Sequence, residues 1–184
     1  MVTLEERVEI PAPFEKLLWW VDHFEEEFVK WSPYHLSCEL YDGGVRVGDR
    51  VRFYEFVCGC DYDVTGRITR AERDKDHFCF LFESDRRTAW ITFEDERTEN
   101  GCRFLHTETF GLKTPVVGPI VNFVIFRILY RKQCRWEVIR EDMQLDNRLL
   151  SDILTKGKYP ERIPEELLQM GKKLAEDGKT MPNS

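Results

Sequence analysis

Residues 102–110, CRFLHTETF, carry the pair of side chains best suited to acid–base chemistry. Alternate side chains of a β-strand share one face, so His106 and Glu108 lie on the same face as Phe104. If the phenylalanine marks the inward side, the imidazole and the carboxyl group point into the protein, where they can transfer protons or hold a metal. The alternative is that both are solvated or hydrogen-bonded near the sheet edge. We take His106 and Glu108 as candidate catalytic residues.

Glu55 shows the same pattern in another stretch. In the segment VGDRVRFYEFVCG it shares a strand face with Val51 and Phe53, so it points inward if they do. A buried carboxylate is costly unless it is paired, which makes Glu55 a partner for His106 or for an arginine. The opposite register, with Tyr54 inward, would place Glu55 on the surface. The sequence leaves both registers open.

The segment KWSPYHLSCE places three further candidates at the junction between a predicted helix and the next strand. These are Trp31, Tyr34 and His35. The imidazole of His35 suits a ligand contact or acid–base chemistry, although a histidine at a turn more commonly has only structural hydrogen bonds. We include all three as candidate ligand-binding residues.

The bulk composition limits the class of protein. With 184 residues, of which 42% are apolar and 33% charged, the chain fits one domain with a substantial core. Thirteen Phe and five Trp favour a large core or a lined cavity. The net charge of −7 argues against a nucleic-acid partner and weakens the case for an anionic membrane surface. We see no secretory signal, so we expect the six cysteines to be reduced thiols in a cytoplasmic protein.

Hydrophobic periodicity predicts the elements that position these residues. RVEIPAP indicates a strand that stops at two prolines, and PFEKLLWWVDHF has the apolar spacing of a helix. EEEFVKW predicts a second short helix, which ends before Pro33. About six strands follow, with turns at RDKD and at Asn100 and Gly101. From about Pro119 to Leu154 no residue breaks a helix, and PEELLQMGKKLAEDG predicts a polar helix before a loose tail.

The front of the last long helix, VVGPIVNFVIFRILY at 116–130, is almost wholly apolar. It is too short, and too interrupted by Gly118, Pro119 and Arg127, to span a bilayer, which needs about 20 apolar residues. Such a segment must then be enclosed by protein. We therefore predict an α+β fold in which a curved antiparallel sheet wraps around a long C-terminal helix, with two short helices after the first strand. Residues 1–156 form this domain, and residues 157–184 form a polar helix and tail.

Four stretches, in this order, resemble the helix-grip superfamily, which includes START domains, the birch-pollen allergen fold, polyketide cyclase-like proteins and coenzyme Q-binding proteins. They are VEIPAPFEKLLWWV, GGVRVGDRVRF, VTGRITRAERDKDHFCFLFE and VVGPIVNFVIFRILYRKQCRWEVIREDMQLDNRLL. They look like the family's opening strand and first helix, its glycine-bearing hairpin, its central hairpin and its long final helix. The resemblance covers about residues 5–155. It implies an internal cavity for an apolar or aromatic small molecule and no single reaction.

Aromatic side chains would line the cavity that this resemblance implies. Besides the polar candidates, we predict ligand contacts with Trp19, Phe80, Phe82, Phe93, Phe110, Phe123, Phe126 and Tyr130. Binding of a lipid, a quinone or a polyketide-like compound is the first function that we predict, and we predict no cofactor. A cyclase or dehydratase that uses His106 and Glu108 is the alternative, and a protein-interaction module that uses the apolar segment is another. The sequence leaves open whether the chain is an enzyme and whether it forms a homodimer.

A metal-assisted hydrolase is a further alternative, because metal-dependent phloroglucinol hydrolases share the helix-grip fold and use His and Glu ligands. Glu137 and Glu141 are one helical turn apart and, with His35 and Glu55, form a loosely similar set. The histidine that those hydrolases carry on the last helix is absent here, where Glu137 and Val138 stand. Our main expectation is therefore a site without a metal.

Overall fold

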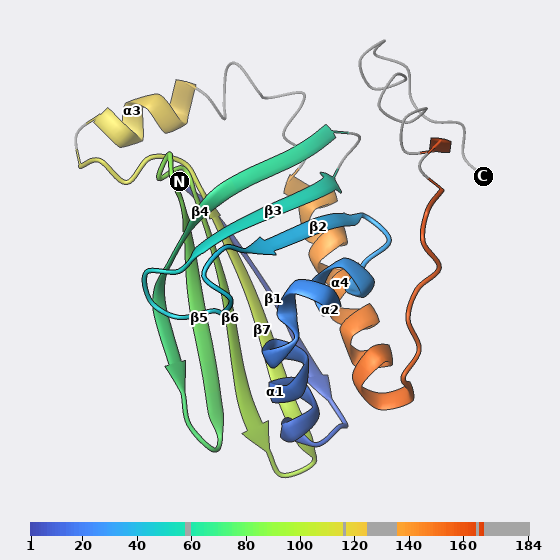
Figure 1. The fold of residues 1–184 in the computed structure, drawn as a ribbon. Coiled ribbons are helices and arrows are strands. Elements are labelled where there is room, and N and C mark those ends of the chain that lie inside the picture. Colours follow the sequence, from blue (N-terminus) through green and yellow to red (C-terminus); the bar gives the residue numbers. More distant parts are fainter. Residues whose placement is uncertain (58–59, 116, 125–135, 165, 168–184) are drawn as a thin grey trace.

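The structure, a computed structural model, describes residues 1–57, 60–115, 117–124, 136–164 and 166–167. Seven antiparallel strands form one curved sheet in the order β1-β7-β6-β5-β4-β3-β2, and helices cover its concave face (Figure 1). The predicted α+β helix-grip arrangement is confirmed. The elements are β1 (Val2–Ile10), α1 (Phe14–Asp22), α2 (Phe24–Trp31), β2 (His35–Leu40), β3 (Arg50–Val57), β4 (Cys60–Arg73), β5 (His77–Ser84), β6 (Ala89–Thr98), β7 (Gly101–Phe110), α3 (Val117–Phe123) and α4 (Trp136–Lys156).

The two short helices follow β1 as the proline pattern predicts. Pro13 lies at the N-cap of α1, where its fixed φ favours the helical turn that follows. The buried face of α1 consists of Phe14, Leu17, Trp20 and Val21, at the spacing of one helix face. Helix α2 ends at Trp31, two residues before a proline. Both helices therefore turn aromatic side chains toward the sheet.

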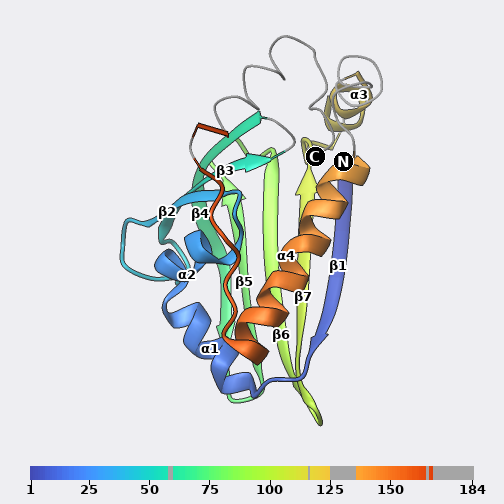
Figure 2. The ribbon, with the colours of Figure 1, turned by 90° about the vertical axis from the view of Figure 1, so that its right-hand side faces the viewer.

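Helix α4 crosses the concave face and packs against β1, β7 and α2 (Figure 2). Between the helices and the sheet lies a core rich in aromatic rings. The ring of Phe24 lies edge-on to those of Trp20, Phe53, Phe80 and Phe93, with centroids 5.3 to 6.1 Å apart. Edge-to-face contacts at these distances add to the stability that the buried ring area already supplies. The concave side of the sheet is thus filled with rings at the end that α1 and α2 cover.

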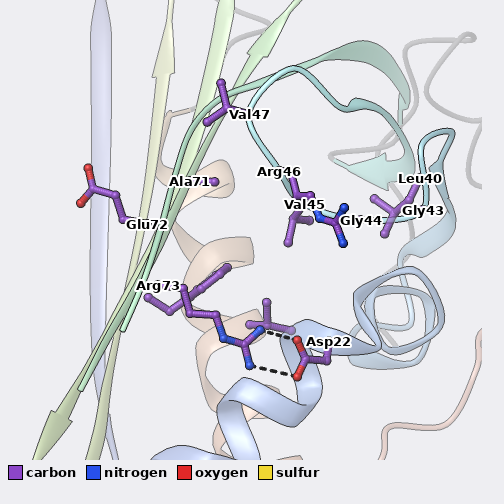
Figure 3. Close-up of a pocket in the computed structure, with 12 residues that line it drawn as sticks. Asp22, Leu40, Gly43, Gly44, Val45, Arg46, Val47, Ala71, Glu72 and Arg73 are labelled. Atoms are coloured by element: carbon purple, nitrogen blue, oxygen red, sulfur yellow. Dashed lines mark hydrogen bonds and ion pairs between the residues drawn. The ribbon is translucent and has the colours of Figure 1, made fainter. Parts of the chain in front are cut away.

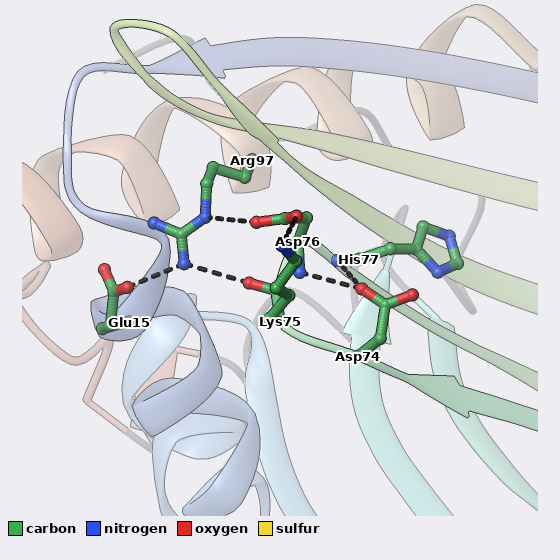
Figure 4. A network of polar contacts seen from close by, with 6 residues as sticks. All are labelled: Glu15, Asp74, Lys75, Asp76, His77 and Arg97. Atoms are coloured by element: carbon green, nitrogen blue, oxygen red, sulfur yellow. Dashed lines mark hydrogen bonds and ion pairs between the residues drawn. The ribbon is translucent and has the colours of Figure 1, made fainter.

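A network of charged side chains ties α1 to the turn between β4 and β5 (Figure 4). The guanidinium group of Arg97 donates to Asp76 at 2.9 Å, to the carbonyl of Lys75 at 3.0 Å and to Glu15 of α1 at 2.7 Å. Within the turn, the carboxylate of Asp74 accepts two backbone N–H groups at 2.8 and 2.9 Å. Through Arg97, the predicted turn at RDKD is therefore connected to the first helix.

The apolar stretch before α4 differs from the prediction. Its described part is a short helix, α3, which lies well away from α4 in Figure 1. Ile120 and Phe123 are 64% and 61% exposed, so the prediction that this stretch is enclosed is wrong for these residues. The carboxamide of Asn122 explains the position, since it bonds both the N–H and the C=O of Leu112, just after β7. Residues 125–135 of the predicted long helix lie outside the described residues.

The chain beyond α4 returns along α2 in an extended form (Figure 2). The hydroxyl of Tyr159 donates to the buried carboxylate of Glu27 at 2.7 Å. The guanidinium group of Arg162 donates to the backbone carbonyls of Val29, Ser32 and His35, at 2.5 to 3.2 Å. This segment therefore caps the C-terminal end of α2, while most of the predicted polar helix over 164–178 lies outside the described residues. In the part of the chain that the structure describes, no helix has both the length and the apolar character that crossing a bilayer requires.

Candidate functional site

A small cavity lies between α4 and the concave face of the sheet, and we call it the central cavity. Its volume is about 20 Å³, which is room for about one water molecule. Side chains from α2, β2, β3, β6, β7 and α4 converge on it. The lining residues are Phe28, Trp31, His35, Phe53, Glu55, Ile91, Phe93, His106, Glu108, Asp142 and Asp146. Six of the eleven are titratable, which is unusual for the interior of a protein.

His35 is the most firmly held of these groups. Its Nδ1 lies 2.8 Å from the carbonyl oxygen of Phe28, and its ring stacks on the Phe28 ring at a centroid distance of 4.0 Å. Its Nε2 lies 3.3 Å from Asp146 Oδ2, with both side chains buried. Burial alone would lower the pKa of His35, but the negative charge and hydrogen bond of Asp146 outweigh it and raise the pKa to about 9. The imidazole is therefore protonated at neutral pH.

Two carboxyl groups of the central cavity titrate near neutrality. Burial raises the pKa of Glu55 to about 7, against the opposing charge of His35. Burial, reinforced by the negative charges of Asp146 and Glu55, raises the pKa of Asp142 to about 8. Each group can therefore both accept and donate a proton at physiological pH, which is the requirement for general acid–base chemistry.

His106 and Glu108 lie next to each other on β7, facing the cavity. The imidazole Nε2 of His106 is 3.2 Å from Glu108 Oε1. That contact lacks hydrogen-bond geometry, and both ring nitrogens of His106 are buried without a hydrogen-bond partner among the described residues. The same holds for Oδ1 of Asp146. Buried polar atoms without a partner are rare in proteins, so three of them in one cavity mark a place where a polar group of a ligand would be stabilised.

The register of the sheet and one buried hydrogen bond bring these residues together. Cross-strand pairing sets His35 opposite Glu55, and His106 opposite Phe93. The indole N–H of Trp31 donates to the backbone carbonyl of Asp146 at 2.7 Å, which joins α2 to α4. Of the two registers that the sequence leaves open for β3, the structure has the one that turns Glu55 inward.

The structure places the residues predicted from sequence in three groups. Those that line the central cavity are Trp31, His35, Glu55, Phe93, His106 and Glu108. Four others are buried or half-buried and do not line it: Tyr34, Phe80, Phe82 and Phe110. Two more lie on the surface, away from the central cavity. Trp19, half exposed, lies beside the buried face of α1 and stacks on His23, and Phe123 is exposed on α3. Phe126 and Tyr130 lie outside the described residues.

The alternative metal set is not brought together. Glu137 and Glu141 are exposed on α4, whereas His35 and Glu55 line the central cavity. Throughout the described ranges, no three His, Cys, Asp or Glu side chains are arranged to hold a metal ion.

The two acidic residues that α4 does contribute, Asp142 and Asp146, are absent from the sequence-based prediction. A signal for Asp146 exists, because it lies three residues after Met143 and four before Leu150, on the buried stripe of the helix. An acidic residue on an apolar stripe is the pattern that reveals a buried charge.

Comparison with known proteins adds a fold assignment. No protein-family model matches the chain, and no curated protein matches it. Among solved structures, it is similar to a polyketide-cyclase-like protein from Corynebacterium glutamicum, with 20% identity, 83% of this chain and 93% of that one covered, and a TM-score of 0.51. It is also similar to a START superfamily protein from Mycobacterium smegmatis, with 15% identity, 85% and 99% covered, and a TM-score of 0.55.

A third similar structure is the Aha1 dimer from Colwellia psychrerythraea, with 16% identity, 86% and 99% covered, and a TM-score of 0.53. These matches span most of every chain compared. The chain therefore has the helix-grip fold, which it shares with these START superfamily and polyketide-cyclase-like structures. At these identities the likeness concerns the fold, and the function has to be argued from the site.

Proposed function

We propose that the chain binds a small molecule with an apolar or aromatic body, whose polar end meets the titratable groups of the central cavity. The observation that carries this proposal is the set of buried polar atoms on His106 and Asp146 that have no hydrogen-bond partner among the described residues. Four carboxyl groups and two imidazoles line the cavity, so a polar end that donates hydrogen bonds complements it. The rings of Trp31 and Phe93 supply apolar walls for the adjoining part of the molecule.

The small volume restricts how such a ligand is held. Room for about one water molecule accepts only a hydroxyl, an amine or a group of that size. The body of the ligand must then lie toward the mouth of the cavity, where the Glu108 side chain is 18% exposed. The proposal therefore requires that side chains around Glu108 move when the ligand binds.

Native mass spectrometry of the purified chain tests this proposal. We expect a small molecule that accompanies the folded protein and is released on denaturation. His106→Leu removes both ring nitrogens while keeping an apolar side chain of similar bulk, so the adduct should be lost. Trp19→Ala, which removes an exposed aromatic residue, is the matched control and should retain it. An adduct that persists in His106→Leu, or the absence of any adduct with the unmodified protein, would contradict the proposal.

Proton-transfer catalysis in the same cavity is the second candidate, and the pKa values of Glu55 and Asp142 near neutrality favour it. A catalyst of this kind would exchange an acidic C–H hydrogen of its bound molecule with solvent. Deuterium incorporation from D₂O, followed by NMR on the molecule identified above, measures that exchange. We expect Glu55→Gln to reduce the exchange at least about 100-fold, the scale of general acid–base catalysis. Equal incorporation with and without the protein would leave binding as the function.

A further inference from the structure

A second and much larger cavity lies where the C-terminal end of α1, the β2–β3 loop and the β4–β5 hairpin meet, and we call it the side pocket (Figure 3). Its volume is about 520 Å³, within the range of about 300–1,000 Å³ that is typical of small-molecule sites. No residue lines both this pocket and the central cavity. The two spaces are therefore separate candidates for ligands of different chemistry.

The inner wall of the side pocket is apolar. Val21 of α1 and Phe78 of β5 are both 3% exposed and belong to the hydrophobic core. Leu40, Val45 and Ala71 are partly buried and pack against that core. A wall of this kind gains stability when an aliphatic or aromatic group replaces water against it.

Most charged residues of the pocket form ion pairs with other described residues. Arg73 and Asp22 form an ion pair that links β4 to α1, with Arg73 Nη2 at 3.0 Å from Asp22 Oδ2 (Figure 3). The carboxylate of Glu72 accepts from Arg70 at 2.6 and 2.8 Å. The guanidinium group of Arg46 has no ion-pair partner in the part of the chain that the structure describes.

The loop that carries Arg46 is held in place by its own hydrogen bonds. The backbone N–H of Arg46 donates to the carboxylate of Asp49 at 2.9 Å. Gly48 donates to the carbonyl of Ile68 at 2.8 Å, and Ile68 donates back to Asp49 at 3.0 Å. Gly48 has a φ of +98°, a conformation that favours glycine. The pocket wall is thus preorganised, which lowers the entropic cost of binding.

We propose that the side pocket binds an amphipathic carboxylate, with its apolar chain against Val21 and Phe78 and its carboxylate on Arg46. A guanidinium group presents paired N–H donors that match the two oxygens of a carboxylate. The apolar wall and the unpaired cation line the same space, so one molecule with both features satisfies both.

Isothermal titration calorimetry with decanoate and decylammonium tests this proposal, because the two probes share a chain length and differ in charge. We expect saturable binding of decanoate and at least about tenfold weaker binding of decylammonium. Arg46→Gln should weaken decanoate binding by about tenfold, the loss expected when a charge-assisted contact becomes a neutral one. Ala71→Phe should abolish binding of decanoate, because the larger ring occupies the wall of the pocket.

Arg148→Gln, which removes an exposed arginine on α4, is the matched control and should leave decanoate affinity unchanged. Circular dichroism shows whether each variant folds, and Arg46→Gln carries the test alone if Ala71→Phe does not fold, since Arg46 is exposed. Equal affinity for the two probes, unchanged affinity in either folded variant, or the absence of saturable decanoate binding would each overturn the proposal. None of these results bears on the central cavity.

Discussion

The central cavity and the side pocket differ in almost every property that decides what a cavity can bind. The central cavity has about 20 Å³ of space and six titratable side chains, including a protonated imidazole and two carboxyl groups that titrate near neutrality. The side pocket has about 520 Å³, an apolar wall and the guanidinium group of Arg46, which has no ion-pair partner among the described residues. The titratable side chains and the larger space therefore lie in different parts of the molecule. A function assigned from cavity size alone would overlook the acid–base cluster.

We expect the largest change in unfolding free energy when the buried ion pair of the central cavity, His35 and Asp146, is broken. Asp146→Asn leaves the protonated imidazole of His35 buried without its counter-charge. Removing one partner of a buried ion pair typically costs about 3–5 kcal/mol of unfolding free energy. Urea unfolding at pH 7 measures this loss. A loss below about 1 kcal/mol would show that the two charges are solvated, as an exposed pair is.

The pH dependence of stability is the next largest effect. The pKa values of His35, Glu55 and Asp142 are all raised on folding, to about 9, 7 and 8. For each, the folded state binds the proton more tightly, so stability is lost as pH rises through these values. Since one pKa unit corresponds to about 1.4 kcal/mol, we expect the three groups together to lower the unfolding free energy by about 3 kcal/mol between pH 6 and pH 7. Urea unfolding at both values checks this.

The control for this pH dependence is a double substitution, Glu55→Gln with Asp142→Asn, which should leave only the smaller part of the fall that His35 contributes. Stability that rises with pH in the unmodified protein would show that the central carboxyl groups are stabilised as anions, the opposite of what their burial indicates.

A smaller effect, of opposite sign, is expected at a buried carboxyl group outside both cavities. Asp95 of β6 is fully buried, and neither carboxyl oxygen has a hydrogen-bond partner within the described residues. Burial, with the nearby charge of Glu94, raises its pKa well above the ordinary value. Asp95→Val should increase the unfolding free energy by about 1–2 kcal/mol, because a buried, unsatisfied carboxyl group is costly. Differential scanning calorimetry measures the change, and a decrease would indicate a hidden partner for Asp95.

The smallest effect is expected at the ion pair of the side pocket. Asp22 and Arg73 are 48% and 45% exposed, so their attraction is screened by water. Asp22→Asn should lower the unfolding free energy by less than about 1 kcal/mol, and salt should reduce the difference further. Urea unfolding at low and high ionic strength tests both statements. A loss equal to that of Asp146→Asn would remove the contrast between the two regions.

Much of the fold follows from local sequence rules. The prolines after β1, the periodicity of α1 and the turns at RDKD and at Asn100 and Gly101 each predict an element that the structure contains. These features depend on a few neighbouring residues, so they can be recognised without tertiary information. The position of α3 depends instead on the contact between Asn122 and Leu112, which no local pattern reveals.

The site was less predictable for the same reason. Alternation along β3 and β7 identifies Glu55, His106 and Glu108 as inward candidates, because strand periodicity is simple. On α4, exposed Glu137 and Glu141 were considered as metal ligands, while buried Asp146, on the apolar stripe of the same helix, was overlooked. The side pocket could not be predicted at all, since it forms where three segments distant in sequence meet.

The contact of Arg162 with the carbonyl of His35 joins the end of the described chain to the central cavity. The imidazole of His35 faces the cavity, while its backbone carbonyl accepts a hydrogen bond from a residue more than 120 positions later. A ligand that displaces His35 would also change this contact, and the docked segment would then change the affinity for that ligand by the same free energy. Protease cleavage of this segment, measured with and without a bound molecule, tests that linkage directly.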